Sequence, residues 1–315
     1  MSPLAKSSET TAGFHDGELA VQKRAGVTNQ AARLAGMLAP GELSGGMARF
    51  LGDRTFAAIT ARGADGILWT SPLTGAPGFL AAATPTTLTI VGSPAPGDPL
   101  HGLSAGQPVG ILVIDFATRR RVRINGTLSQ ATASDLFIDV EQAYGNCPQY
   151  IQHRTVTTTD RQAAGSSAQY SSVTDEDRAL IRASDTFLLG TTHPTRGTDT
   201  SHRGGPAGFV RVDDGGDLWW PDYPGNNMFN SLGNIAIDPA TALLFIDFAS
   251  GHTLHLAGRA ATEWSSHPGT PGDDGSTGRR TAVTVEHVVN RESSLHSTAV
   301  VPYPHNPPTT NGTRR

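Results

Sequence analysis

The sequence contains very little cysteine, few aromatic residues and no large charge of either sign. Its single cysteine, Cys147, excludes an intrachain disulfide and any metal site built from several cysteines. The 24 Lys and Arg residues against 28 Asp and Glu residues leave a formal net charge of −4, so a nucleic-acid partner is not expected. The 11 histidines lack the spacing of metal ligands, and we expect no metal site.

Long hydrophobic runs are also missing. No stretch is long and apolar enough to span a membrane, and residues 1–9 lack the apolar core of a signal peptide. A lone thiol is typical of proteins in a reducing compartment. We therefore expect a cytoplasmic protein without a membrane partner.

Glycine and proline are abundant instead. The 36 glycines and 21 prolines among 315 residues indicate many turns between short elements. The length permits two domains of ordinary size. The composition therefore favours a mainly β protein with a few helices.

A long internal repeat runs through the chain. Three pairs of matching segments lie at a nearly constant spacing: 53–56 and 184–187, 78–79 and 208–209, and 114–117 and 246–249. Duplication of one domain is the simplest explanation. We expect Asp115 and its repeat counterpart Asp247 to satisfy backbone donors at strand ends rather than to form a catalytic pair.

Runs of β-branched and aromatic residues between Gly, Pro and Asp turns predict short strands in the second copy. They cover residues 186–192, 199–203, 208–212, 217–220, 242–249 and 252–260, with a last strand at 281–289. Six short strands in about 75 residues predict a small closed or split barrel in each copy.

Three helices are expected. Residues 17–38 have an amphipathic pattern, and a capping box at Thr174 predicts a helix to about residue 183. Pro224 and Gly225 break the chain before a third helix, which should start near Asn226 or Asn227. That helix should bury the apolar side chains Met228, Phe229 and Leu232.

These patterns divide the chain into five parts. We expect an N-terminal helical segment (1–50), a first, degenerate barrel (51–140), a linker with a short helix (141–183), a second, ligand-binding barrel (184–290) and a disordered tail (291–315).

The first informative difference between the copies lies in the second predicted strand. Ser201, His202 and Arg203 stand where the first copy has residues 71–73, Ser-Pro-Leu. The forked guanidinium of Arg203 suits a phosphate, and Ser201 adds a hydroxyl. This strand is a candidate anion site, unless Arg203 pairs with a carboxylate such as Asp222.

The second difference follows the fourth predicted strand. Asn226, Asn227 and Asn230 lie where a helix is expected to begin. Free backbone N–H groups at a helix start, together with neutral amide donors, favour a bound phosphate. The alternative is that the asparagines only cap the helix.

Other residues have simpler interpretations. Residues 119–121, three arginines at a hairpin turn, are expected to form a solvated charge cluster. Cys147 is expected to be structural or inert rather than a redox thiol. Of Trp219 and Trp220, one ring should pack in the core, and the other is a candidate wall of a ligand site.

Residues 200–212, 221–234 and 243–248 resemble the pyridoxamine 5′-phosphate oxidase-related family of FMN-binding split barrels. More narrowly, the chain resembles bacterial members with two barrels in tandem, with further likeness in segments 14–22 and 144–152. The resemblance covers roughly residues 14–290 and implies two tandem six-stranded split β-barrels.

The resemblance also implies an FMN site between barrels, with the phosphate held by a strand and a loop of the second barrel. The site residues carried over are Ser201, His202, Arg203, Asp222, Tyr223, Asn226, Asn227 and Asn230. Relatives often have Arg at the position of Asn227, so Arg203 would neutralise more of the phosphate charge here. The tail lacks the substrate-binding Arg and His of the vitamin B6 oxidase, so a true pyridoxamine 5′-phosphate oxidase is not expected.

The function expected from this resemblance is FMN-dependent oxidation or reduction of a small organic substrate, with one FMN per chain. NADPH, NADH or a reductase would supply electrons, and the barrels would pair within the chain or in a homodimer. No catalytic residue can be assigned from the sequence. The alternative is a non-catalytic binding module for a flavin, a deazaflavin or a haem, or a scaffold.

Overall fold

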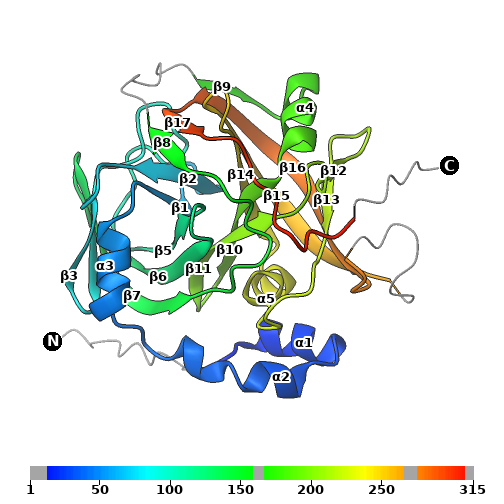
Figure 1. The fold of residues 1–315 in the computed structure, drawn as a ribbon, viewed down its shortest axis with the longest axis horizontal. Coiled ribbons are helices and arrows are strands. Elements are labelled where there is room, and N and C mark those ends of the chain that lie inside the picture. Colours follow the sequence, from blue (N-terminus) through cyan, green and yellow to red (C-terminus); the bar gives the residue numbers. More distant parts are fainter. Residues whose placement is uncertain (1–12, 159–166, 266–274, 309–315) are drawn as a thin grey trace, which may run out of the picture.

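Two β-barrels lie side by side in the computed structural model, which describes residues 13–158, 167–265 and 275–308 (Figure 1). The first barrel is a sheet of seven strands in the order β2-β1-β5-β6-β7-β4-β3. Its strands are β1 (Phe56–Arg62), β2 (Leu68–Thr74), β3 (Leu80–Thr84), β4 (Thr87–Val91), β5 (Gln107–Asp115), β6 (Arg120–Ala131) and β7 (Asp135–Gly145).

The second barrel repeats this topology, with the strand order β11-β10-β14-β15-β16-β13-β12. Its strands are β10 (Thr186–His193), β11 (Gly197–Gly204), β12 (Arg211–Val212), β13 (Leu218–Pro221), β14 (Ala240–Asp247), β15 (His252–Trp264) and β16 (Arg279–Glu292). A further strand, β9 (Ser167–Tyr170), pairs with β16. The fold class predicted from the sequence, tandem split barrels in a mainly β chain, is confirmed.

Each sheet nevertheless has seven strands along its path rather than the predicted six. In the second barrel the extra strand is β16, which the sequence analysis predicted as a separate last strand and which pairs with β15 and β13. Its counterpart β7 runs to Gly145, past the expected boundary at residue 140. Asp115 and Asp247 accept hydrogen bonds from the backbone N–H groups of Ala117 and Ala249, as predicted.

The N-terminal helical segment is broken rather than continuous. Residues 17–38 were predicted as one helix, but Gly26 has a φ of 71°, which ends the first helical stretch. The helices are α1 (Asp16–Arg24), α2 (Thr28–Ala32), the 3-10 turn η1 (Ala35–Leu38), α3 (Gly45–Gly52), α4 (Asp175–Ala183) and α5 (Asn230–Ile237). Among the described residues, none of these helices could cross a membrane.

Helix α4 begins as predicted, whereas α5 begins later. Thr174 and Asp177 form the expected capping box at the start of α4. The prediction that α5 starts at Asn226 or Asn227 is wrong, because Asn227 and Phe229 both have left-handed backbone angles (φ 61°) that a helix cannot contain. Met228 is fully buried as expected, while Phe229 is only partly buried.

The prediction of a disordered tail from residue 291 is wrong for residues 291–301, which are ordered in the structure. Strand β17 (Leu295–Ser297) pairs with β8 (Val156–Thr158), and Val301 bridges to His153. Leu295 is fully buried among apolar side chains between the barrels, and this burial anchors the segment. Residues 309–315 of the predicted tail lie outside the described residues.

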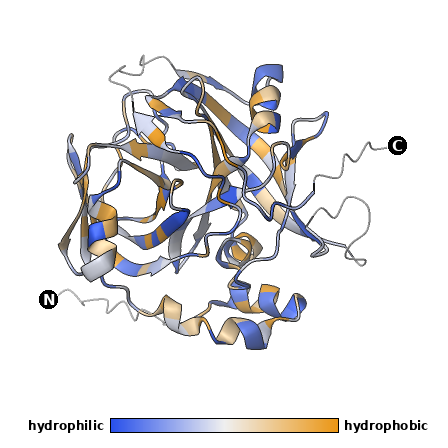
Figure 2. Cartoon of the chain, in the orientation of Figure 1, coloured by the Kyte–Doolittle hydropathy of each residue, from blue (hydrophilic) through white to orange (hydrophobic). Residues whose placement is uncertain are grey.

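Each barrel has its own hydrophobic core, and a third apolar cluster lies between the barrels. Along the strands, short hydrophobic and hydrophilic stretches alternate, as expected for sheets with one face in a core (Figure 2). In the third cluster Phe116 meets its repeat counterpart Phe248, with ring centroids 5.8 Å apart. The two copies therefore contact each other through equivalent residues.

The barrels pack reciprocally at close range. Strand β11 lies on β5 and β6, and the equivalent β2 lies on β14 and β15. A Cβ atom at Gly110 would come within 2.7 Å of the backbone of Asp199, and one at Gly190 within 2.4 Å of Thr60 Cγ2. Glycine is therefore required at both positions for this distance between sheets.

We predict that Gly190→Ala destabilises the protein by about 1–3 kcal/mol, because the added methyl overpacks the interface. The measurement is the urea midpoint of unfolding. Gly46→Ala in α3 is the matched control, because nothing lies within 4 Å of its Cβ position, and it should be neutral or stabilise by about 0.5 kcal/mol. Equal midpoints for the two variants would contradict the prediction.

Candidate functional site

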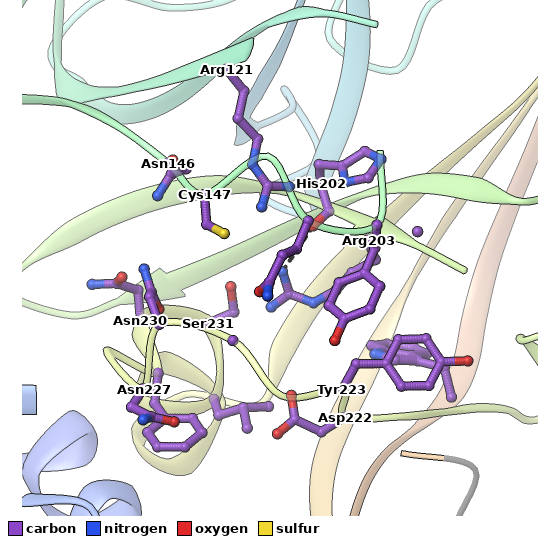
Figure 3. Close-up of a pocket in the computed structure, with 18 of the residues that line it drawn as sticks. Arg121, Asn146, Cys147, His202, Arg203, Asp222, Tyr223, Asn227, Asn230 and Ser231 are labelled. Carbon is purple, nitrogen blue, oxygen red and sulfur yellow. Dashed lines mark hydrogen bonds between the residues drawn. The ribbon is translucent and has the colours of Figure 1, made fainter. Parts of the chain in front are cut away.

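A cavity of about 150 Å³ lies where the two barrels and the segment between them meet (Figure 3). The first barrel contributes residues of β5 and β6, and the second contributes β11, β13, the loop after β13 and the start of α5. The polar residues of its wall are Arg121, Arg123, Asn146, Cys147, Gln149, Tyr150, His202, Arg203, Asp222, Tyr223, Asn226, Asn227, Asn230 and Ser231.

The residues predicted from the sequence are brought together here, with one exception. His202, Arg203, Asp222, Tyr223, Asn226, Asn227 and Asn230 all line the cavity. Ser201 does not line the cavity. Ser201 is buried behind the wall, where Arg123 donates to its hydroxyl and Ser231 lies 2.8 Å away.

Arg121 also lines the cavity, although the sequence analysis placed it in a solvated cluster. That prediction is wrong for Arg121, because β6 begins at Arg120 and turns the next side chain inward. Arg120 remains exposed and stacks on Phe50, while Arg119 donates to the carbonyl of Ile151. The sequence does contain a signal for this position of Arg121. Arg121 and Arg123 are two residues apart in a predicted alternating run, so their side chains share one face of a strand.

Arg121 and Arg203 bring positive charge into the cavity from opposite barrels. Neither makes an ion pair within the described residues. The Nε atom of Arg121 is buried and has no hydrogen-bond partner there, and Arg203 donates only to the carbonyl of its neighbour His202. Burial, followed by the charges of Arg203 and Arg123, lowers the pKa of Arg121 to about 9. Arg121 is therefore charged at pH 7, and neither guanidinium has an ion-pair partner among the described residues. The charge of Asp222 acts on Arg203 from a longer distance and opposes the lowering of its pKa by burial.

The carboxylate proposed as an alternative partner of Arg203 is engaged elsewhere. Asp222 lies 2.8 Å from Nε of Arg279, whose guanidinium packs against the rings of Phe229 and Trp264. Burial raises the pKa of Asp222, and Arg279 opposes this. The interpretation of Arg203 as a simple partner of Asp222 is not what the structure shows.

His202 is neutral in this environment. Burial, then the charges of Arg121 and Arg203, hold its pKa well below the usual value. Arg121 Nη1 donates to His202 Nδ1 at 2.9 Å, which leaves the ring proton on Nε2. The imidazole therefore orients Arg121 and adds no charge.

The third arginine of the cavity, Arg123, is neutralised. Its Nε lies 2.8 Å from the buried carboxylate of Asp199, and its Nη1 donates to the hydroxyl of Tyr144. The same carboxylate accepts from Ser201 and Ser231. This buried network supports the cavity wall and leaves the charges of the other two arginines unbalanced.

The opposite wall is the start of α5. Phe229, at the N-cap position, provides no side-chain cap, so the first N–H groups of the helix have no intrahelical or capping partner. Asn226 accepts from the N–H of Met228, which precedes the helix and so does not cap it, whereas the amide of Asn230 donates to Glu18 of α1. The helix start therefore adds backbone donors to a cavity that already holds two cations.

Aromatic rings form the remaining wall. Tyr150 lies 5.1 Å from Tyr223 between ring centroids and has a left-handed backbone (φ 63°). Trp220 packs against Phe187 in the core, as predicted, and also reaches the cavity. Trp219 lies outside the cavity, between Arg211 and Arg280. Trp220 rather than Trp219 is thus the candidate ligand wall.

Cys147 lines the same cavity, partly buried. Figure 3 shows its sulfur pointing into the space that Arg121 and Arg203 face. The sequence predicted an inert linker thiol, and its chemical role stays a prediction.

The equivalent position in the first barrel holds a smaller cavity of about 100 Å³, whose cation, Arg291, has a carboxylate partner. Asp98, from the loop after β4, accepts from Ser71 at 2.5 Å and from Arg291 at 2.8 Å. Ser71 is the repeat counterpart of Ser201, and Asp98 and Arg291 are both buried. The carboxylate of Asp98 therefore neutralises Arg291 in the first barrel's cavity.

The donors and cations of the cavity fit a phosphate group. A phosphate carries up to two negative charges and takes several hydrogen bonds, for which two guanidinium groups and a helix start are suited. The aromatic wall beside them fits the flat ring of a flavin. FMN, which combines these two parts, is compatible with the residues present.

Comparisons with known proteins agree with the fold of the second barrel. Residues 173–268 match the family model described as pyridoxamine 5′-phosphate oxidase. The chain matches no curated protein.

Three solved structures illustrate the likeness. HupZ from Group A Streptococcus is 14% identical, with 40% of this chain and 99% of that chain covered and a TM-score of 0.30. A protein related to general stress protein 26, from Clostridium acetobutylicum, is 14% identical (39% and 91% covered, TM-score 0.26). HutZ, a haem storage protein from Vibrio cholerae, is 9% identical (42% and 94% covered, TM-score 0.25).

We predict that Arg121→Gln stabilises the ligand-free protein by roughly 1 kcal/mol, because it removes a desolvated charge that has no counterion. The same change should reduce the stabilisation that added inorganic phosphate gives to the wild type. Thermal unfolding with and without phosphate measures both effects. A variant that is less stable than the wild type but responds equally to phosphate would contradict this assignment.

Proposed function

We propose, from the relationship of its second barrel to the pyridoxamine 5′-phosphate oxidase family, that this chain binds FMN in the cavity between its barrels. In this proposal the bound flavin oxidises or reduces a small organic substrate. The second barrel provides most of the phosphate site, and the first barrel adds Arg121.

The observation that carries the proposal is the pair of guanidinium groups without carboxylate partners. Arg121 and Arg203 face one cavity from two barrels, and an anion there would offset the repulsion that Arg203 exerts on Arg121. Hydrogen bonds between charged partners contribute about 1.5–3 kcal/mol each, so two such cations suit a dianionic phosphate. Arg121 also replaces the cation that relatives often carry at the position of Asn227.

When bound, the flavin supplies the hydride or electron transfer. The chain's own residues bind and orient it: Arg203, Arg121 and the start of α5 hold the phosphate end, and His202 keeps Arg121 in place. The enclosed volume of about 150 Å³ is below the roughly 300–1,000 Å³ of complete small-molecule sites. It therefore suits the phosphate end of the ligand better than the whole molecule.

The same reasoning supports one site per chain. In the first barrel Asp98 already neutralises Arg291, and the positions of His202 and Arg203 hold Pro72 and Leu73. An anion would have to displace a buried carboxylate there, which is unfavourable.

We expect the purified protein to contain, or to take up, about one FMN per chain. Absorbance before and after denaturation, with the released chromophore identified by mass, measures this ratio. A ratio near two would show that the first barrel also binds. A colourless protein that takes up no added FMN would rule out the flavin function.

Arg203→Ala should weaken FMN binding by about 1.5–3 kcal/mol, or roughly 10- to 150-fold in Kd, because a charge-assisted hydrogen bond is lost. Quenching of flavin fluorescence measures the Kd. Arg280→Ala is the control, since Arg280 pairs with Glu263 at the surface and should leave the Kd unchanged. Equal affinities in the two variants would remove Arg203 from the site.

A flavin that NADPH, NADH or a reductase reduces and that a substrate reoxidises would support an oxidoreductase. A flavin that stays bound but inert across donors would instead support the binding module. Stopped-flow absorbance of the bound flavin distinguishes the two outcomes.

A further inference from the structure

Helix α1 is attached to the start of α5 by a row of polar contacts. His15, which caps α1, lies 3.1 Å from the side-chain oxygen of Asn234, and Gln22 of α1 donates to the carbonyl of Met228. Glu18 lies between them and accepts from the amide of Asn230. Residues 15, 18 and 22 share one helical face, so α1 presents a polar stripe to α5.

Helices α1 and α5 approach each other closely at two glycines, Gly17 and Gly233. A Cβ atom at Gly17 would lie 2.2 Å from the carbonyl oxygen of Gly233, and one at Gly233 would lie 2.6 Å from Glu18 Cγ. This distance fixes Glu18 against the first turn of α5. In Figure 1, α1 lies directly beside α5, at the edge of the second barrel.

Asn230 separates two cavities. On one side it lines the site that Arg121 and Arg203 face, and on the other it lines a second cavity of about 30 Å³. Glu18 and Asp199 also line the second cavity, which has room for about one or two water molecules. Glu18 therefore lies directly behind a residue of the proposed phosphate site.

Glu18 is buried, with only 2% of its surface exposed. Its carboxylate accepts from the backbone N–H of His15 and from Asn230, and burial raises its pKa to about 7. The charged groups that act on it are Arg196 and Asp199, with Arg123 at longer range, and the neutral His15 and Tyr144 also lie near it. Near neutral pH the Glu18 carboxyl group is therefore partly protonated and partly ionised.

We propose that Glu18 is a positioning residue of the ligand site, which holds the Asn230 amide at the start of α5 and takes up a proton when an anionic ligand binds. This inference rests on the proposed function, because it requires an anion in the cavity beside Asn230. It makes the N-terminal helix part of the site and not only a flanking segment.

The direction of the pH effect follows from charge. A bound phosphate places negative charge on the far side of Asn230, which raises the pKa of Glu18 above its value of about 7 in the free protein. At a pH between the Glu18 pKa of the free protein and that of the bound protein, ligand binding is accompanied by proton uptake at Glu18. Affinity for the ligand therefore falls as pH rises through that range. The second phosphate pKa of about 6 lies below this range. The pKa of His15, about 4, and that of His202 lie below it too.

The experiment is FMN titration by calorimetry at pH 7.0 to 7.8, in buffers of different ionisation enthalpy, for wild type, Glu18→Gln and Glu18→Ala. The matched control is Asp177→Asn, which alters the carboxylate of the equivalent capping box of α4, away from the cavity. Circular dichroism confirms that each variant is folded.

We expect wild type and Asp177→Asn to take up on the order of half a proton per FMN bound. Glu18→Gln should take up none and keep a Kd independent of pH, because Gln resembles the protonated acid. Glu18→Ala should weaken binding about tenfold, because Asn230 loses its partner.

Equal proton uptake by wild type and Glu18→Gln would overturn the proton coupling, and wild-type affinity in Glu18→Ala would overturn the positioning role. Failure of wild type to bind either FMN or inorganic phosphate would overturn the proposed function itself, and this inference with it. The outcomes are therefore distinguishable.

Discussion

The unbalanced positive charge of Arg121 and Arg203 is the constraint on which the site depends. The charge of Arg203 disfavours that of Arg121, and the packing of the barrels, together with the hydrogen bonds of both groups to His202, holds them at one cavity. The apolar cluster between the barrels, with Phe116 against Phe248, stabilises this arrangement. Burial of apolar surface thus offsets the electrostatic cost of holding two cations at this cavity.

The two copies of the repeat form barrels with the same strand order, but their side chains differ at equivalent places. In the second barrel the strand carries His202 and Arg203 toward a cavity, and in the first the corresponding segment is neutral. At the first position Asp98 neutralises Arg291. The two barrels therefore share a topology and differ at these places in a few side chains and one loop.

The sequence predicts the second barrel well because strand formation here follows from local alternation and turn residues. All seven segments predicted as strands in that copy, including 281–289, correspond to β10 to β16. It also places the candidate site on β11 and the loop after β13, because those are the points where the copies differ. Local pattern cannot show which residues of the first barrel face the second, and for that reason Arg121 was misassigned.

Two further differences between the sequence prediction and the structure also arise from contacts or backbone angles that local sequence pattern does not show. The start of α5 depends on the backbone angles of Asn227 and Phe229, which residue preferences alone do not favour. The order of the segment after residue 291 depends on the burial of Leu295 between the barrels. Because both barrels, α1 and the intervening segment belong to one polypeptide, this cavity does not need a second molecule to assemble it. At a given pH, dilution of the protein should therefore not take this cavity apart, as it does for sites shared between separate chains.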